Sequence, residues 1–187
     1  GSDRAFYPPM SDLLKQWGIH TFEGYRPENL DWKPDFVVVG NVIRRDNPEA
    51  KRMRELKIPH GSFPSTFAAM YLSDRRPVVV TGTHGKTTTT SLTAWLFEHA
   101  DMEPGLLVGG LPRNFGSSFR LGNGPHFIVE GDEYDTAYFD KVPKFLHYRP
   151  QVGIITNIEF DHADIYDSIE SIETVSYTHL TLPTNQC

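Results

Sequence analysis

The sequence is poor in cysteine and has no long apolar run. Its 187 residues include one cysteine, Cys187. An intramolecular disulfide is therefore excluded, and a reducing, cytoplasmic compartment is expected. A membrane-spanning helix needs about 20 consecutive apolar residues, and no stretch approaches that length. No secretory signal peptide is visible. These absences argue against a membrane partner.

An excess of positive charge is also missing. The chain has 18 Lys and Arg against 24 Asp and Glu, a net charge of −6, and no basic stripe. Nucleic acid is therefore not an expected partner. The apolar content of 39% and the aromatic content of 12% suffice for a packed core. The length fits one or two domains.

One glycine is absent from the most informative motif. A β-branched run at 78–81 leads into a glycine-bracketed turn and then an amphipathic segment. The general phosphate-loop pattern G-x-x-x-x-G-K-[ST] has its first glycine where this chain has Val80. The order strand, loop, helix still predicts a nucleotide-binding loop. Its expected contacts are Gly82, Thr83, His84, Gly85, Lys86, Thr87 and Thr88.

Strand and helix patterns alternate along the chain. Strands are predicted near 36–40, 126–131 and 152–157, and helices over about 10–17, 48–56 and 86–100. Such alternation is typical of a parallel α/β sheet. In the helix after the loop, the spacing of four residues predicts a buried stripe of Leu92, Trp95, Leu96 and His99.

Two further predicted strands lead to groups that suit a metal site. Glu130 ends one strand, and His162 follows another. Ligands of open α/β sheets lie at the carboxyl ends of the strands. We therefore expect Mg²⁺ to be held by Thr87, Glu130 and His162, with Lys86 clamping the transferred phosphoryl group. His162 could instead hold a metal-bound water or be a core histidine.

The fold expected from these patterns is α/β, with a truncated Rossmann-like N-terminal domain followed by a partial P-loop-type central domain. The boundaries are 1–75, 76–175 and a tail of foreign character at 176–187. Gly1-Ser2-Asp3 matches the end of a second strand whose first strand is missing. Asp3 would then contact a ribose hydroxyl of the substrate. The alternative is that Asp3 is a surface residue.

Three segments make the resemblance specific. The loop 81–88, with Val80 before it, is similar to the ATP loop of the Mur ligase family, and 157–164 resembles that family's metal-associated histidine segment. Glu130 falls where the family has its metal-binding glutamate. Segments 109–116, 130–141 and 144–150 resemble the member that acts in peptidoglycan recycling.

The resemblance implies an ATP- and Mg²⁺-dependent ligase. ATP would phosphorylate the carboxylate of UDP-N-acetylmuramate, and the amine of the tripeptide L-Ala-γ-D-Glu-meso-diaminopimelate would attack the acyl phosphate. Lys86, Glu130 and His162 would carry the catalytic roles. Because family segments are missing at both ends, we expect little or no turnover from this chain alone.

Three alternatives remain open. The family member that adds L-alanine shares the ATP loop. A non-catalytic nucleotide-binding module would keep 82–88 but lose the acidic and histidine strand ends, which are present here. A P-loop kinase or GTPase would be expected to have the first loop glycine and a base-specific motif such as N-K-x-D, and neither is visible.

Overall fold

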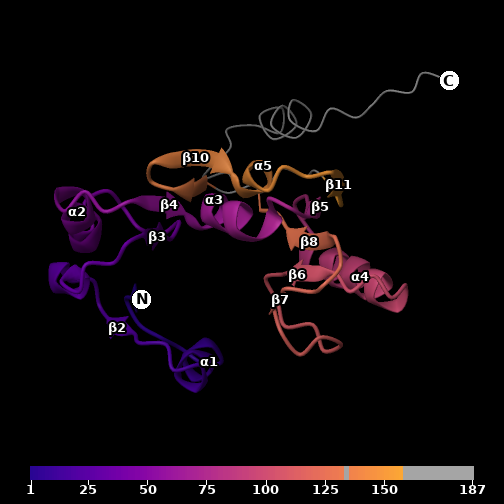
Figure 1. The fold of residues 1–187 in the computed structure, drawn as a ribbon, viewed down its shortest axis with the longest axis horizontal. Coiled ribbons are helices and arrows are strands. Elements are labelled where there is room, and N and C mark those ends of the chain that lie inside the picture. Colours follow the sequence, from indigo (N-terminus) through magenta and orange to yellow (C-terminus); the bar gives the residue numbers. More distant parts are fainter. Residues whose placement is uncertain (133–134, 158–187) are drawn as a thin grey trace. The chain divides into compact units, whose positions relative to one another are not determined.

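The computed structural model describes residues 1–132 and 135–157. The chain divides into two compact units. Unit 1 comprises Gly1–Phe63 and Ala137–Asp140, and unit 2 comprises the remaining residues. Figure 1 traces the chain through both units.

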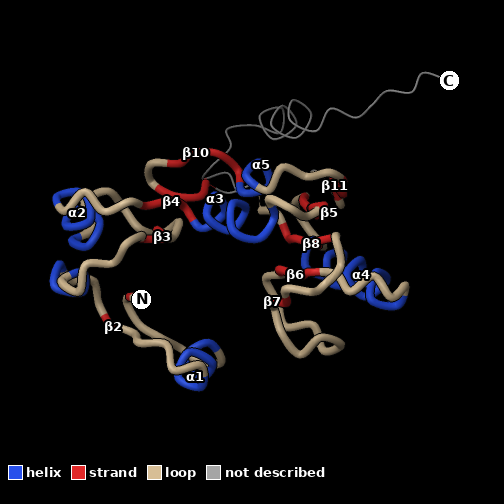
Figure 2. Tube along the Cα trace, viewed as in Figure 1, coloured by secondary structure: helices blue, strands red, loops and turns tan. Residues whose placement is uncertain are grey.

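Unit 2 is built on a five-stranded sheet of order β11-β5-β8-β6-β7 (Figure 2). The strands are β5 (Arg76–Thr81), β6 (Gly105–Leu107), β7 (Phe119–Arg120), β8 (His126–Glu130) and β11 (Val152–Ile155). All pairings are parallel except that of β7 with β6. The predicted α/β fold class is therefore confirmed, and β5 lies between β8 and β11.

The sheet is apolar on both faces, as expected for parallel strands covered on each side. Alternate residues of β5 enter two separate clusters. Val79 packs with Phe127 and Val129, and Val78 packs with Ile128 and Leu106. The first cluster is completed by Phe67, Leu72, Phe145 and Tyr148, and the second by Ala94 and Val108.

Helix α4 (Lys86–His99) follows β5 as predicted, but the predicted buried stripe is wrong. Leu92 is 57% exposed and Leu96 60% exposed, whereas Thr90 and Ala94 are fully buried. The helix presents small side chains to the sheet, which permit a close approach of its backbone. Spacing alone could not show which of two possible faces is covered.

Five further elements belong wholly or partly to unit 2, and not all of them were anticipated. Helix α3 (Phe63–Phe67), which begins at the last residue of unit 1, continues into a π-helical turn, Ala68–Leu72. Strands β9 (Asp135–Ala137) and β10 (Asp140–Pro143) pair with one another, and α5 (Lys144–His147) follows. The sequence did not predict this strand pair. Lys144 Nζ lies 2.7 Å from Asp132 Oδ2, so α5 is tied to the segment after β8.

Unit 1 contains two separate two-stranded parallel sheets. One pairs β1 (Ser2–Asp3) with β2 (Phe22–Glu23), and the other pairs β3 (Val37–Val39) with β4 (His60–Ser62). Its helices are α1 (Met10–Gln16), the 3-10 turn Pro27–Leu30 and α2 (Pro48–Glu55). The Asn47 side chain accepts hydrogen bonds from the Glu49 and Ala50 amides, which explains why α2 begins there.

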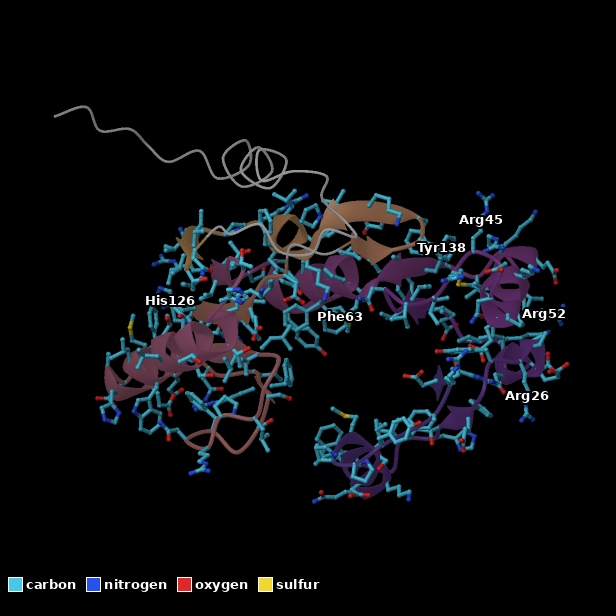
Figure 3. The ribbon with its side chains drawn as sticks, turned by 180° about the vertical axis from the view of Figure 1, so that it is seen from behind. Arg26, Arg45, Arg52, Phe63, His126 and Tyr138 are labelled. Carbon is cyan, nitrogen blue, oxygen red and sulfur yellow. The ribbon has the colours of Figure 1, made fainter. Side chains whose placement is uncertain are left out.

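The core of unit 1 is small. Leu30, Val39, Met53 and Ile58 form its buried cluster, with Tyr138 packed against it. Arg54 donates one hydrogen bond to the Tyr138 hydroxyl, at 2.7 Å, and one to the Arg45 carbonyl, at 2.8 Å. Figure 3 labels Tyr138 and Arg45 in this part of the unit. Within the described residues, no helix has the length and apolar character needed to cross a membrane.

A buried phenol in unit 2 leads to a prediction about alkaline stability. Tyr148 is 2% exposed, and burial, with a smaller effect of Asp132, raises its pKa well above 10. Above pH 10 the unfolded chain therefore loses a proton that the folded chain keeps, so folding stability falls as pH rises. We expect a decrease of about 1.4 kcal/mol per pH unit from this group.

Tyr148→Phe should remove that slope between pH 10 and 11, measured by urea unfolding. Tyr7→Phe, which alters a tyrosine that is 73% exposed, is the matched control and should leave the slope unchanged. An identical slope in Tyr148→Phe and the unaltered chain would contradict the prediction.

Candidate functional site

The predicted phosphate loop links β5 to α4. Gly82 has a φ of 120° and Gly85 a φ of 78°, both in the left-handed region that favours glycine. Gly85 is the N-cap of α4, and no described side chain caps this helix end. The first-turn amides of the helix thus face the loop, where an anion would meet them and the positive end of the helix dipole.

The loop is held against the end of β11. The Thr83 amide donates to the Asn157 carbonyl at 3.1 Å, and the His84 amide donates to Asn157 Oδ1 at 2.8 Å. The Thr156 hydroxyl donates to the His84 carbonyl at 2.6 Å. Asn157 begins the segment 157–164 that resembles the family's histidine segment, but the sequence did not predict that Thr156 or Asn157 holds the loop.

Gly82 is required for a second reason besides its φ. A Cβ at this position would lie 2.4 Å from Thr156 Oγ1 and 2.7 Å from the Asn157 carbonyl oxygen. Both distances are far below van der Waals contact. The absence of a side chain at Gly82 therefore allows the loop to approach the residues that follow β11.

Lys86 is folded back over the loop that precedes it. Its Nζ donates to the Gly82 carbonyl at 2.7 Å and to the Thr83 carbonyl at 3.2 Å. Thr88, two residues after Lys86 in α4, has an exposed side chain. The ammonium group is thus located at the mouth of the loop, in the region where the phosphates of a nucleotide would lie.

Thr87 and Glu130 are brought together by the pairing of β5 with β8. The Thr87 hydroxyl donates to Glu130 Oε1 at 2.9 Å. The Gly109 amide donates to Glu130 Oε2 at 2.8 Å. Gly109 begins the segment 109–116 that carries part of the family resemblance, but it was not predicted to be a site residue. The carboxylate is therefore oriented by the first turn of α4 and by the loop that follows β6.

The oxygen donors fit a magnesium ion. A carboxylate and a hydroxyl in contact are the hard ligands that Mg²⁺ prefers, with further positions filled by water and phosphate. Within residues 1–132 and 135–157, no group of three His, Cys, Asp or Glu side chains forms a metal cluster. The third predicted ligand, His162, lies outside the described residues.

A cavity of about 610 Å³ adjoins Thr87. Its walls come from the first three turns of α4 and from the loop 111–115. Arg113 and Asn114 add polar groups to a lining that also contains Leu92, Trp95 and Phe115. A small polar molecule in this cavity would lie beside the Thr87 and Glu130 pair.

Asp3, the predicted substrate contact, is in unit 1. Its Oδ1 accepts hydrogen bonds from the Arg4 amide at 2.6 Å and the Tyr25 hydroxyl at 2.9 Å. Burial and the hydrogen bond to Asp3 raise the pKa of the Tyr25 phenol. The carboxylate is exposed and lines a cavity of this unit. Its contact with a ribose stays a prediction.

These features define an α/β protein whose predicted phosphate loop lies beside a carboxylate. The model of the Mur ligase middle domain matches residues 80–178. The model described as Mur ligase family, catalytic domain, matches residues 1–74. The chain belongs to the Mur ligase family.

Individual relatives agree with this assignment. The chain is 45% identical over 173 residues to the UDP-N-acetylmuramate–L-alanyl-γ-D-glutamyl-meso-2,6-diaminoheptandioate ligase of Escherichia coli, and the match covers 92% of this chain and 38% of that ligase. It is 37% identical over 165 residues to the UDP-N-acetylmuramate–L-alanine ligase of Alkaliphilus metalliredigens, covering 88% and 34%.

A solved structure is also similar. The crystal structure of the UDP-N-acetylmuramate:L-alanyl-γ-D-glutamyl-meso-diaminopimelate ligase from Neisseria meningitides has a TM-score of 0.90 and 43% sequence identity. The match covers 94% of this chain and 57% of the chain in that crystal structure. The match therefore extends over both units, although the chain spans well under two thirds of the relatives' length.

The steric argument at Gly82 gives a testable prediction. Gly82→Ala should destabilise unit 2 by about 3 kcal/mol, from backbone strain together with the clash against Thr156 and Asn157. Gly116→Ala is the matched control, because Gly116 also has a left-handed φ, 63°, but no atom within 4 Å of its Cβ position.

The control should cost about 1 kcal/mol, the strain contribution alone. Thermal and urea unfolding of both variants would measure the difference. Equal losses in the two variants would show that close packing against the end of β11 does not restrict position 82.

Proposed function

We propose that this chain is the nucleotide-binding part of an ATP-dependent ligase that joins UDP-N-acetylmuramate to a muropeptide-derived tripeptide in the cytoplasm. The single observation that carries the proposal is the contact between Thr87 and Glu130 beside the phosphate loop. A loop for phosphates and a ligand pair for the accompanying cation are the parts that phosphoryl transfer from ATP needs.

The chain's own groups would hold the nucleotide in a specific way. The first-turn amides of α4 would donate to phosphate oxygens. Lys86 Nζ would exchange its carbonyl partners at Gly82 and Thr83 for the β- and γ-phosphates. Thr87 and Glu130, with His162 as the further predicted ligand, would hold Mg²⁺, which neutralises charge on the phosphates.

The reaction that fits this arrangement has two steps. A carboxylate oxygen of UDP-N-acetylmuramate attacks the γ-phosphorus of ATP, and ADP leaves with the electron pair of the broken P–O bond. The tripeptide amine then attacks the acyl carbon, inorganic phosphate leaves, and the amine loses a proton. The cavity beside Thr87 is where the attacking carboxylate would be positioned, with Arg113 and Asn114 nearby.

The tripeptide is favoured over L-alanine as the incoming amine by sequence similarity. Identity is 45% to the ligase named for the tripeptide and 37% to the ligase named for L-alanine. A non-catalytic binding module is disfavoured because it would have no need of a carboxylate oriented by two hydrogen bonds.

Glu130→Gln tests the nucleotide site. Neutralising the carboxylate should weaken the Mg²⁺-dependent part of ATP binding by about tenfold or more, because the cation loses a charged ligand. Calorimetric titration of ATP with and without Mg²⁺ would separate the two contributions.

Glu28→Gln, a change at an exposed glutamate of unit 1, is the matched control and should bind as the unaltered chain does. If the unaltered chain binds ATP equally well with and without Mg²⁺, the assignment of Glu130 as a cation ligand fails.

Substrate choice is tested in a longer polypeptide. A chimera would carry this chain's matched region in place of the corresponding region of the E. coli ligase, of which the match covers 38%. With UDP-N-acetylmuramate and ATP, we expect phosphate release to be at least about a hundredfold faster with the tripeptide than with L-alanine. A preference for L-alanine would contradict the proposed tripeptide substrate and favour the activity of a UDP-N-acetylmuramate–L-alanine ligase.

A further inference from the structure

Arg120 is a charged residue of β7, the strand at one edge of the sheet in unit 2. It lies opposite Leu106 in the antiparallel pairing of β7 with β6. Directly opposite residues of such a pair project from the same face of a sheet, and Leu106 packs with Ala94 of α4. The Arg120 side chain therefore lies on the face that α4 covers, where its Nη1 is 3.0 Å from Glu98 Oε2 of that helix.

The same guanidinium group contacts the ring of Phe115. Arg120 Cζ lies 5.8 Å from the centroid of that ring, which is within the range of a cation–π interaction. The Phe115 ring also meets Trp95 of α4 edge to face, with the ring centroids 5.7 Å apart and the planes at 85°. Phe115 is thus held by side chains from two elements that the sheet brings together, β7 and α4.

Phe115 closes a turn that carries polar groups of the cavity of about 610 Å³. Its amide donates a hydrogen bond to the Pro112 carbonyl at 3.1 Å. Arg113 and Asn114 lie inside this turn and line the cavity. Arg120 is not among the described residues of that lining, so its effect on the cavity passes through Phe115.

The beginning of the loop that leads into this turn is held beside the proposed cation site. The Gly109 amide donates to Glu130 Oε2 at 2.8 Å. A Cβ at Gly110 would lie 2.9 Å from Thr87 Cγ2, so the backbone is in close contact with α4 at this point. The loop is therefore fixed at its start by the ligand pair, and the contacts of Phe115 fix its end.

We propose that Arg120 is a positioning residue for the carboxylate substrate. Through Phe115 it fixes the turn of Arg113 and Asn114 relative to the cation site, so that the attacking carboxylate is held in line with the γ-phosphate. This inference rests on the proposed function, since it takes the cavity as the place of that carboxylate. The phosphate loop does not depend on Arg120, because the residues that follow β11 restrain it.

Arg120→Met, which removes the charge but keeps an unbranched side chain, is tested first in the full chain by amide hydrogen exchange. The Phe115 and Gly116 amides both donate to the Pro112 carbonyl. Their exchange should become about tenfold faster, because the turn opens more often when its outer contact is lost. Exchange in β5 and β8 should change by less than about twofold, which separates movement of the turn from a loss of stability of the whole sheet.

The effect on the reaction is measured in the chimera with the E. coli ligase. Arg120→Met should lower kcat/KM for UDP-N-acetylmuramate about tenfold, because the bound carboxylate is less often aligned, and should leave the KM for ATP within about twofold. Arg120→Lys keeps a cation beside Glu98 and Phe115 and should recover at least about half of the loss. A purely structural contribution would change the constants for both substrates together.

Arg76→Met is the matched control. Arg76 is an exposed arginine of the same sheet, at the end of β5 that is opposite to the phosphate loop. This change should leave exchange in the turn and the kinetic constants as they are in the unaltered proteins. If Arg120→Met does not fold, Glu98→Gln takes its place, because it removes the charged partner of Arg120, and about threefold effects are then expected.

Two results would overturn the inference. The first is unchanged exchange at Phe115 and Gly116 in Arg120→Met. The second is an active chimera in which Arg120→Met either has no effect or changes the constants for ATP and UDP-N-acetylmuramate equally. An unaltered chimera that releases no phosphate with either amine would contradict the proposed function itself, so the two failures are distinguishable.

Discussion

The parallel pairing of β5 with both β8 and β11 is the constraint on which the candidate site depends. Val80 lies opposite Glu130 in one pairing, and Thr81 lies opposite Ile155 in the other. Parallel strands end at the same edge of a sheet, so this register brings together the phosphate loop, the Glu130 carboxylate and the residues that follow β11. The two apolar clusters on the faces of the sheet stabilise this register, because a shift by one residue would exchange their members.

The loop itself is positioned mainly by main-chain contacts. Asn157 receives the amides of both Thr83 and His84, and Gly82 lies so close to it that no Cβ fits. A rigid anion-binding loop needs such restraint, since preorganised donors cost no further ordering when the ligand arrives. In this chain, which has Val80 where the general motif has its first glycine, the loop is restrained through Gly82 and Asn157.

Unit 1 has a small buried core and several large apolar side chains that are exposed to solvent. Its buried cluster contains four residues, and large apolar side chains such as Trp32 and Val42 remain exposed around the cavity. Open strand edges that border apolar surface are ordinarily avoided in folded proteins, because they favour pairing with other chains. Glu49 accepts hydrogen bonds from the Ser2 hydroxyl and the Asn29 side-chain amide, so polar contacts tie β1 and the turn Pro27–Leu30 to α2.

The sequence by itself determined those features that depend on neighbours along the chain. The β-branched residues before Gly82 and the alternation of strands and helices act locally, and both were found where they were predicted. The tertiary structure alone decided which side of α4 is buried, because Thr90 and Ala94 allow close packing that the spacing of the larger residues could not reveal. It also decided that the Gly109 amide orients Glu130, since a backbone donor carries no signature in residue type and acts only where the fold brings two strand ends together.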